Sequence, residues 1–212
     1  MKPDNPPTAS PKQSARDKLL TVALQVIRQH GYAGTTVDDL CAAAGVTKGA
    51  FFHHFDSKET LGVEAAKHWS ETTGALFATA PYHDHDDPYA RFIAYIDFRR
   101  DLLNGTLPEI TCLAGTMIQE TYDTHPAIRD ACRDSVFSHA ATLEADIAAA
   151  MEERNITADW TPASLALHTQ AVLQGAFILA KAQDNPAVAI DHVVHLKRYV
   201  ELLFNQTPSG KE

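Results

Sequence analysis

Hydrophobic residues recur along almost the entire chain at the three- and four-residue steps of an amphipathic α-helix. Between residues 15 and 30, for example, Leu19, Ala23, Val26 and Ile27 fall on one helical face. No segment shows the strict alternation that a half-buried strand requires, so the pattern predicts an all-α fold. We expect about nine helices, at residues 15–30, 37–44, 46–55, 58–79, 88–104, 110–122, 126–154, 162–183 and 186–204.

Residues that start and stop helices set most of these limits. Gly31 and Gly45 follow the first two patterns, as glycine commonly does at helix C-termini. Thr36 precedes the second helix, and Asp87 precedes a proline at the first position of the fifth, and both are N-cap signals. The sequence NGTLP at 104–108 predicts a break between helices.

The chain divides into a terminal segment and two helical parts. Residues 1–13 are polar and rich in proline, which predicts a disordered tail. Residues 14–62 are expected to form a first domain and residues 63–212 a second, with no linker between them. Residues 11–70 carry seven Lys or Arg and six Asp or Glu, whereas residues 71–212 carry ten and twenty. This asymmetry indicates that the two parts meet different partners.

Cysteine usage and hydropathy bear on where the protein works. Three cysteines are too few for a disulfide framework, which favours a reducing compartment. No apolar run approaches the roughly 20 residues of a membrane span, and the N-terminus has no apolar signal core. We therefore expect a cytoplasmic protein that does not associate with a membrane.

The segment VTKGAFFHHFDSK, at residues 46–58, is basic and aromatic although the whole chain carries a formal charge of -9. Two short helices joined by a glycine turn, 37–44 and 46–55, are typical of a helix-turn-helix. Gly49 would let the second helix approach DNA closely, and Lys48 lies at its N-terminal end, where the helix dipole favours phosphate. The spacing of Phe51 and Phe55 turns both toward the core and leaves Phe52 outward.

The stretch HGYAGTTVDDLCAAAGVTKGAFFHHFDSKETL closely resembles the DNA-binding motif of the tetracycline-repressor (TetR) family, and the resemblance covers residues 14 to about 62. It implies a ligand-responsive regulator, most simply a repressor, with a variable helical domain for ligand binding and dimerisation. Lys58 would hold a phosphate. The family usually has tyrosine where Phe52 stands, so Phe52 would instead meet an apolar group such as a thymine methyl. The implied DNA contacts are Thr36, Thr47, Lys48, Gly49, Phe52, His53 and Lys58.

The second domain is expected to hold an elongated, largely apolar pocket for an apolar or aromatic small-molecule effector. Its helices carry aromatic and isolated polar residues on faces that periodicity turns inward, although a solid core would bury the same residues. His139 or His168 would orient the ligand. The full set of candidate lining residues is Phe92, Tyr95, Ile96, Met117, Phe137, His139, His168 and Phe177.

The last two helices are expected to pair with those of a second copy in a four-helix bundle, as the resemblance also implies. A homodimer would read a palindromic operator. The alternative packs the same apolar faces within one chain. The stripes in question are Leu165, Val172, Leu173, Ala176, Phe177 and Ala180 on one helix, and Ile190, Val193, Val194, Val200, Leu203 and Phe204 on the other.

Several other groups have two interpretations each. Cys112 is either a sensor of oxidants or electrophiles or a buried small side chain. Arg99 and Arg100 either meet an anionic ligand or pair with carboxylates of the acidic domain. The YHDHDDP loop at 82–88 and the pair His192 and His195 could bind metal but suit solvated positions better, so we expect neither metal nor cofactor. No catalytic motif appears, and we expect no enzymatic activity.

Overall fold

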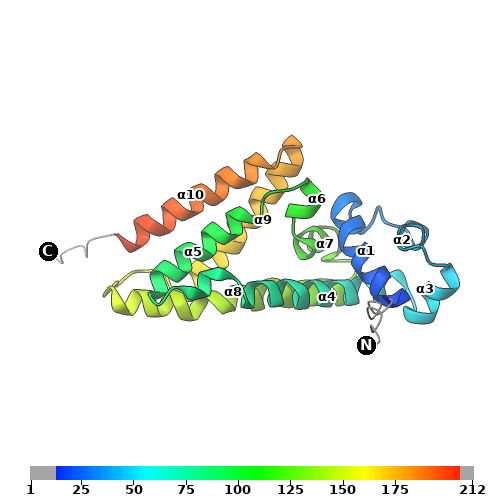
Figure 1. The fold of residues 1–212 in the computed structure, drawn as a ribbon, viewed down its shortest axis with the longest axis horizontal. Coiled ribbons are helices and arrows are strands. Elements are labelled where there is room, and N and C mark those ends of the chain that lie inside the picture. The colour runs from blue at the N-terminus through cyan, green and yellow to red at the C-terminus, as the bar shows by residue number, and fades with distance from the viewer. Residues whose placement is uncertain (1–12, 206–212) are drawn as a thin grey trace, which may run out of the picture.

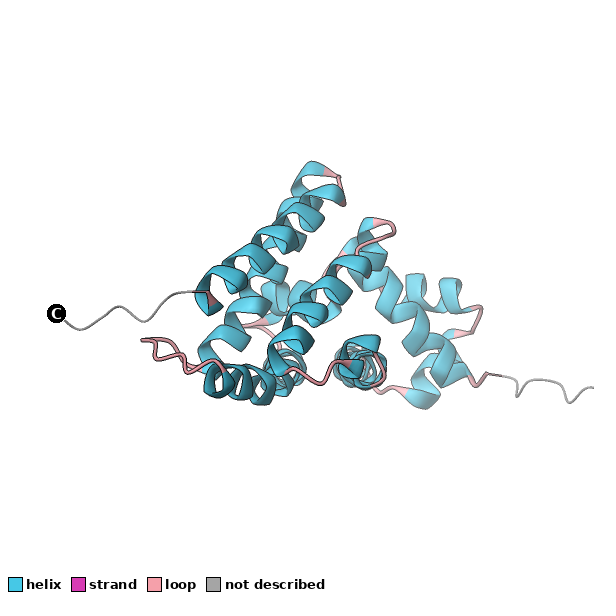
Figure 2. Cartoon of the chain, turned by 60° about the vertical axis from the view of Figure 1, so that its left-hand side comes forward, coloured by secondary structure: helices cyan, strands magenta, loops and turns pink. Residues whose placement is uncertain are grey.

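A computed structural model describes residues 13–205, and every regular element in that range is helical (Figure 1; Figure 2). This confirms the predicted all-α fold. The tail predicted at 1–13 lies, except for Gln13, outside the described residues. The elements are α1 (Ala15–His30), α2 (Val37–Ala44), α3 (Lys48–His54), α4 (Lys58–Ala78), the 3-10 helix η1 (Pro81–Asp84), α5 (Pro88–Asp101), α6 (Leu107–Ile110), α7 (Leu113–Thr121), α8 (Pro126–Glu153), α9 (Pro162–Gln183) and α10 (Ala187–Phe204).

The described chain therefore has ten α-helices where the sequence predicted about nine. The additional helix is α6, which begins inside the segment predicted as a break. Its start is a capping box, in which the Glu109 carboxylate accepts from the backbone N–H and the hydroxyl of Thr106, both at 2.8 Å. Pro108 falls in the first turn, where its missing N–H costs no hydrogen bond. The proline that predicted a break thus helps to start a short helix.

The helices build an elongated molecule with a compact group at one end (Figure 1). We call residues 14–62, with α1, α2, α3 and the first turn of α4, the head, and residues 63–205 the body. The long helices α4 and α8 pack along each other and connect the two. In the body, α9 packs between α8 and α10, and α5 lies against both α8 and α10.

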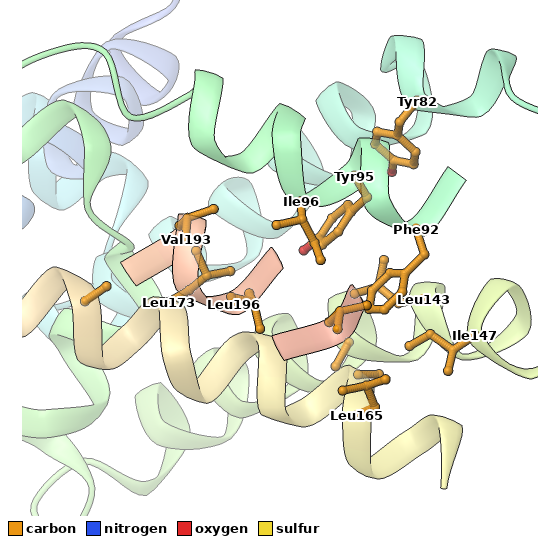
Figure 3. Close-up of a cluster of buried hydrophobic side chains, with 14 of the residues drawn as sticks. Tyr82, Phe92, Tyr95, Ile96, Leu143, Ile147, Leu165, Leu173, Val193 and Leu196 are labelled. Atoms are coloured by element: carbon orange, nitrogen blue, oxygen red, sulfur yellow. The ribbon is translucent and has the colours of Figure 1, made fainter. Parts of the chain in front are cut away.

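The body core forms where η1, α5, α8, α9 and α10 meet (Figure 3). Phe92, Tyr95 and Ile96 on α5 are each 1% exposed and face Leu143 and Leu173 across the core. Close packing of this kind leaves little free space between side chains. These three residues of α5 therefore fill the interior.

A second core joins the head to the body. Leu19, Leu40 and Phe51 of the head are fully buried in one cluster with Leu113 and Met117 of α7. Residues from the start of α8, including Ile128 and Cys132, belong to the same cluster. The head therefore completes its hydrophobic core only with side chains from the body.

Helix α9 is more apolar than was expected of any segment of the sequence. It has 22 residues and a window of mean hydropathy 1.3, so by length and composition alone it could cross a membrane. Its residues Leu165, Leu173 and Phe177 are buried in the body core, and a core helix of this kind passes the same test. The prediction that no apolar segment approaches the length of a membrane span was therefore wrong for α9.

Candidate nucleic-acid interface and ligand cavity

The turn between α2 and α3 is fixed by its caps. Thr36 and Asp39 form a capping box at the start of α2, and Thr47 caps α3 by accepting from the Ala50 N–H at 3.1 Å. Gly45 ends α2 in the left-handed region, with φ 64°, which glycine adopts without steric cost. The predicted helix at 46–55 is shorter at both ends because Thr47 and Phe55 act as its caps.

Helix α3 buries one face and exposes the other. Phe51 and Phe55 are buried, as their spacing predicted, and Phe52 is 54% exposed. Lys48 and His53 are exposed on the same helix. The free face of α3 thus offers a cation, an imidazole and an aromatic ring, which is a chemically suitable set for a DNA major groove.

Gly49 lies on this free face without a packing reason. A Cβ placed there would meet only the Thr47 hydroxyl, at 3.7 Å. Alanine would therefore fit the isolated protein, and it is the better helix former by about 1 kcal/mol. The absence of a side chain is consistent with close approach by a partner outside the chain.

Four of the expected DNA contacts, Thr36, Thr47, Lys48 and Lys58, already have partners within the head. The Thr36 hydroxyl donates to Asp39 at 2.6 Å and accepts from the Asp39 N–H at 3.1 Å. The Thr36 hydroxyl and the Thr36 backbone N–H, the latter at 2.8 Å, both donate to the Asp39 carboxylate and lower its pKa. Lys48 forms an exposed ion pair with Asp38 at 2.8 Å. Lys48 can exchange this partner for DNA, whereas Thr36 can donate to a phosphate only by breaking its cap.

Lys58, at the start of α4, links this helix to the segment between α1 and α2 within the head. Its ammonium donates to the carbonyl oxygens of Tyr32 and Thr35, both at 3.0 Å, and lies 4.3 Å from the Tyr32 ring centroid. An ammonium has three N–H donors, so one remains for a phosphate. The structure thus gives Lys58 a stabilising role that the sequence did not predict.

A cavity of about 180 Å³ lies in the body, close to its junction with the head. Helices α4, α5, α8 and α9 and the segment 109–112 surround it. The contribution of α4 was missed, although its spacing of Trp69, Thr73 and Leu76 shows a helical face that could have indicated it. The lining residues are Trp69, Thr73, Leu76, Phe77, Arg99, Leu102, Leu103, Glu109, Ile110, Thr111, Cys112, Ser135, Val136, His139, Gln170, Gln174 and Phe177.

Of the eight predicted lining residues, only His139 and Phe177 face this cavity. Phe92, Tyr95 and Ile96 are in the solid body core, and Met117 is in the core shared with the head. Phe137 is 54% exposed, and His168 is also exposed, with its ring centroid 5.1 Å from that of Tyr199. Helical period places a residue on a face, but it cannot say whether that face meets a core, a cavity or solvent.

His139 connects the cavity wall to the body core. Its Nε2 lies 3.0 Å from the Tyr95 hydroxyl, which also accepts from the Gln170 amide at 3.3 Å. The Tyr95 hydroxyl, which accepts from Gln170, has its own proton available for the Nε2 of a neutral His139 ring. Burial, with a smaller effect of Arg99, lowers the pKa of His139 to about 4, so the ring is neutral at pH 7.

Comparisons with known proteins identify both halves of the chain. Residues 19–65 match the family described as bacterial regulatory proteins, tetR family, and residues 88–195 match the tetracyclin repressor-like C-terminal domain. The chain belongs to the TetR family. The family is regulatory, and its members bind operator DNA and small-molecule effectors and act as dimers in the cytoplasm. This protein is accordingly a ligand-responsive, DNA-binding transcriptional regulator.

Individual relatives agree with that assignment. The chain is 26% identical over 170 residues to the HTH-type transcriptional repressor DhaR from Mycobacterium sp. strain GP1, covering 80% of this chain and 84% of DhaR. It is 42% identical over 59 residues to the repressor KstR2 from Rhodococcus jostii, covering 26% and 29%. A TetR-family regulator from Agrobacterium tumefaciens has the same fold, with a TM-score of 0.78, 20% identity, and coverage of 88% and 97%.

In this TetR-family chain, Arg28 of α1 reaches from the head to the cavity wall. Its guanidinium donates to the carbonyl oxygen of Glu109 at 2.9 Å and to that of Thr111 at 3.4 Å, and it lies 5.0 Å from the Trp69 ring centroid. Burial lowers the pKa of Arg28. All three partners line the cavity, so a change in the wall acts directly on α1.

A second contact crosses the same junction in the opposite direction. The carboxylate of Glu120, on α7, accepts from the Ala33 N–H at 2.7 Å, just beyond the end of α1. The two contacts hold both sides of the α1 C-terminus, where Gly31 has the positive φ of 80°. The head is thus tied to α6 and α7 by hydrogen bonds as well as by the shared core.

Cys112 lies between the cavity and the junction. Its Sγ caps α7 by accepting from the Gly115 N–H at 3.5 Å, and the side chain is partly exposed. Cys41 and Cys132 are buried. Cys112 is therefore the cysteine, among the three, that a molecule in the cavity could reach.

The faces proposed for dimerisation from sequence are largely used within the chain. Leu165, Leu173 and Phe177 of α9 and Val193 and Val200 of α10 are buried in the body core. A different stripe is free: the exposed large apolar residues on these helices are Leu167, Ile178, Leu179, Tyr199 and Leu202. Most residues of the two predicted stripes therefore pack within one chain, which was the alternative to the dimer.

Within residues 13–205, no group of three or more His, Cys, Asp or Glu side chains is arranged to hold a metal ion. In the YHDHDDP loop, His83 bonds to the Phe77 carbonyl at 3.0 Å, and Asp87 caps α5. His192 lies 2.8 Å from the Val188 carbonyl on its own helix. These histidines therefore have ordinary structural partners.

Proposed function

We propose that this protein is a repressor that binds a palindromic operator as a homodimer and leaves it when a small molecule enters the body cavity. The supporting observation is Arg28, which bonds from the head to the backbone of the cavity wall. A ligand that moved segment 109–112 would move α1, and with it α3. The relative DhaR is described as a repressor, which supports the direction of regulation.

The DNA contacts in this proposal come from the free face of α3 and its surroundings. Thr47, Lys48, Gly49, Phe52 and His53 are all exposed there. We assign base reading to Lys48 and His53, and an apolar contact to Phe52. Thr36 and Lys58 would act chiefly by holding the head in shape, with the third N–H of Lys58 on a phosphate.

The dimer in this proposal uses the free stripe of α9 and α10. On α9, Leu167, Gly175 and Ile178 follow one another at helical spacing, and no atom lies within 4 Å of a Cβ placed at Gly175. On α10, Tyr199 and Leu202 are also exposed. Two hairpins related by a two-fold axis would bury these residues, and the glycine would allow close helix approach.

The proposed function is tested by measuring binding to DNA from upstream of the protein's own gene, with and without ligands that raise its melting temperature. Release of the DNA by stabilising ligands is expected. Arg28→Gln should keep the ligand-induced stabilisation and reduce DNA release, because the bond between wall and head is lost. Stabilising ligands that leave DNA binding untouched would show that the cavity does not control the head.

A second mode of regulation has one specific observation in its favour. Cys112 both lines the cavity and caps α7. It directly follows Thr111, whose carbonyl oxygen accepts a hydrogen bond from Arg28. We propose that an oxidant or electrophile that modifies this thiol would disturb the same wall. Treatment with N-ethylmaleimide should then release DNA from the wild type and not from Cys112→Ser. Equal release from both proteins would exclude Cys112 as the sensor.

A further inference from the structure

The cavity wall carries an arginine without a carboxylate partner. Arg99, near the end of α5, has its guanidinium carbon 5.1 Å from the Phe77 ring centroid, and no ion pair is formed to it anywhere in residues 13–205. Its neighbour Arg100 points elsewhere and pairs with Asp97 and Asp101, both at 3.1 Å. The sequence suggested the same two roles for Arg99 and Arg100, but the structure gives them different environments.

Most arginines of the body have a carboxylate partner; Arg99, like Arg198 on α10, has none among the described residues, but only Arg99 lines the cavity. Residues 71–212 contain twenty Asp or Glu against ten Lys or Arg. Arg91 pairs with Asp146 at 2.9 Å, and Arg154 lies 3.5 Å from Asp87. Arg129 and Arg133 also have aspartate partners. Arg99 is on the cavity side of α5, where the carboxylate of a bound ligand could supply a counter-charge.

A second polar group of the wall also lacks a partner. Thr111 is 1% exposed, and its hydroxyl has no hydrogen-bond partner among the described residues. A buried hydroxyl without a partner destabilises the protein, because the group loses its hydrogen bonds to water and gains none in return. Because Thr111 lines the cavity, a polar atom of a bound molecule could satisfy it.

The rest of the wall is suited to an aromatic ring. Trp69, Leu76, Phe77 and Phe177 contribute apolar surface. The one carboxylate among the lining residues, Glu109, is already bound by the backbone N–H and hydroxyl of Thr106. It therefore competes little with a ligand for Arg99.

Building on the proposed function, we infer that the effector is a small aromatic carboxylate, with its carboxylate on Arg99 and its ring among the aromatic side chains of the wall. Arg99 lies over the ring of Phe77, which leaves the N–H groups in the guanidinium plane free to bind a carboxylate with two parallel hydrogen bonds. The cavity of about 180 Å³ is comparable to the roughly 150 Å³ cavity known to bind benzene.

The test compares matched ligands that differ only in charge. Benzoate, phenylacetate and cinnamate are each compared with the corresponding amide, using the full-length protein. Thermal stability and affinity for operator DNA are measured with each compound. The carboxylates should bind about tenfold or more tightly than the amides, since a charged hydrogen-bonded pair is lost in the amides.

Two arginine variants locate the effect. In Arg99→Met, which removes the charge and keeps an apolar side chain of moderate length, the preference for carboxylates should disappear. In Arg100→Met, the matched control, it should persist. Equal binding of acids and amides by the wild type, or a preserved preference in Arg99→Met, would overturn the inference. If neutral compounds bind in the cavity and release DNA, the proposed function stands and only the ligand class is wrong.

Discussion

At the scale of single residues, the structure distinguishes side chains that serve the fold from side chains left available for partners. Lys48 and Lys58 belong to the same motif and were assigned to DNA together. Lys48 has one exposed partner, Asp38, whereas Lys58 bonds to two backbone carbonyls in the head. The family resemblance predicts that both lysines contact DNA. The contacts in this structure show that Lys58 also stabilises the head.

The two lysines should therefore respond differently to removal. Lys48→Ala should weaken operator binding by about 1–3 kcal/mol and leave the melting temperature nearly unchanged, because its ion pair is exposed. Lys58→Ala should weaken binding and also destabilise the protein, by about 1–2 kcal/mol for the two charge-assisted hydrogen bonds. Thermal unfolding and operator titration of both variants check this. Equal melting temperatures for the two variants would contradict the structural role of Lys58.

Gly49 offers a prediction in which stability and function change in opposite directions. Gly49→Ala should raise the stability of the isolated protein by up to about 1 kcal/mol, since the added methyl meets only Thr47 at 3.7 Å. The same methyl should weaken operator binding by obstructing close approach of α3. Denaturation and DNA titration of one protein sample measure both. Gly74→Ala, also in open space on a helix, is the control and should leave DNA binding unchanged.

His139 gives the protein a predictable response to acid. Its pKa is lowered to about 4 in the folded state, against about 6.5 in an unfolded chain, so the unfolded state binds the proton more tightly. Stability contributed by the neutral ring is present above pH 6.5 and is lost as the pH falls toward 4. Between pH 7 and pH 5 this loss should be about 2 kcal/mol.

Urea unfolding at the two pH values measures this loss. His139→Gln should reduce the difference between pH 7 and pH 5 by most of that amount. His168→Gln, a change at an exposed histidine, should retain the wild-type difference. An unaltered pH dependence in His139→Gln would mean that the ring titrates with little effect on folding.

At the scale of helices, most of the fold could be predicted from the sequence, and the exceptions have local causes. Caps and periodicity located α1, α8, α9 and α10 to within a few residues. The short α6 was missed because four residues are too few to show a period, and its proline suggested a break. Six of the eight residues predicted to line the pocket lie outside the cavity, and no lining residue was predicted from α4, which contributes Trp69, Thr73 and Leu76.

The two faces of α9 show why periodicity alone could not distinguish the core-facing residues from those left exposed. The helix is apolar nearly all round, so its sequence predicts burial without saying against what. Leu173 and Phe177 meet the body core, whereas Leu167 and Ile178 are exposed. Only the arrangement of the other helices decides which stripe remains for a second copy.

The proposed dimer predicts a specific effect of one substitution on that free stripe. Ile178→Glu should produce a monomer, because two charges would be buried near the two-fold axis. Sedimentation at micromolar concentration should give a species of 23.2 kDa for this variant and twice that mass for the wild type. Tyr122→Glu replaces another exposed apolar residue, away from α9 and α10, and should remain dimeric. A wild-type monomer would contradict the dimer itself.

At the scale of the whole molecule, the cavity, the junction and the head form one connected path. The cavity wall bonds to α1 through Arg28, and α1 packs against both α2 and α3. A ligand need not reach the head to affect it. It needs only to bind more tightly to a form in which segment 109–112, and hence α1, has moved. A useful switch requires this preference to reach a few kcal/mol.

The core that the head shares with α7 and α8 has a consequence for building chimeric regulators. Grafting residues 14–62 onto another sensor would remove Leu113, Met117 and Ile128 from beneath Leu19 and Phe51. The transplanted segment would then expose apolar surface or pack poorly on its new host. A functional exchange of specificity should instead either carry the matching side chains of α7 and α8 along with the head, or alter only the outward residues of α3.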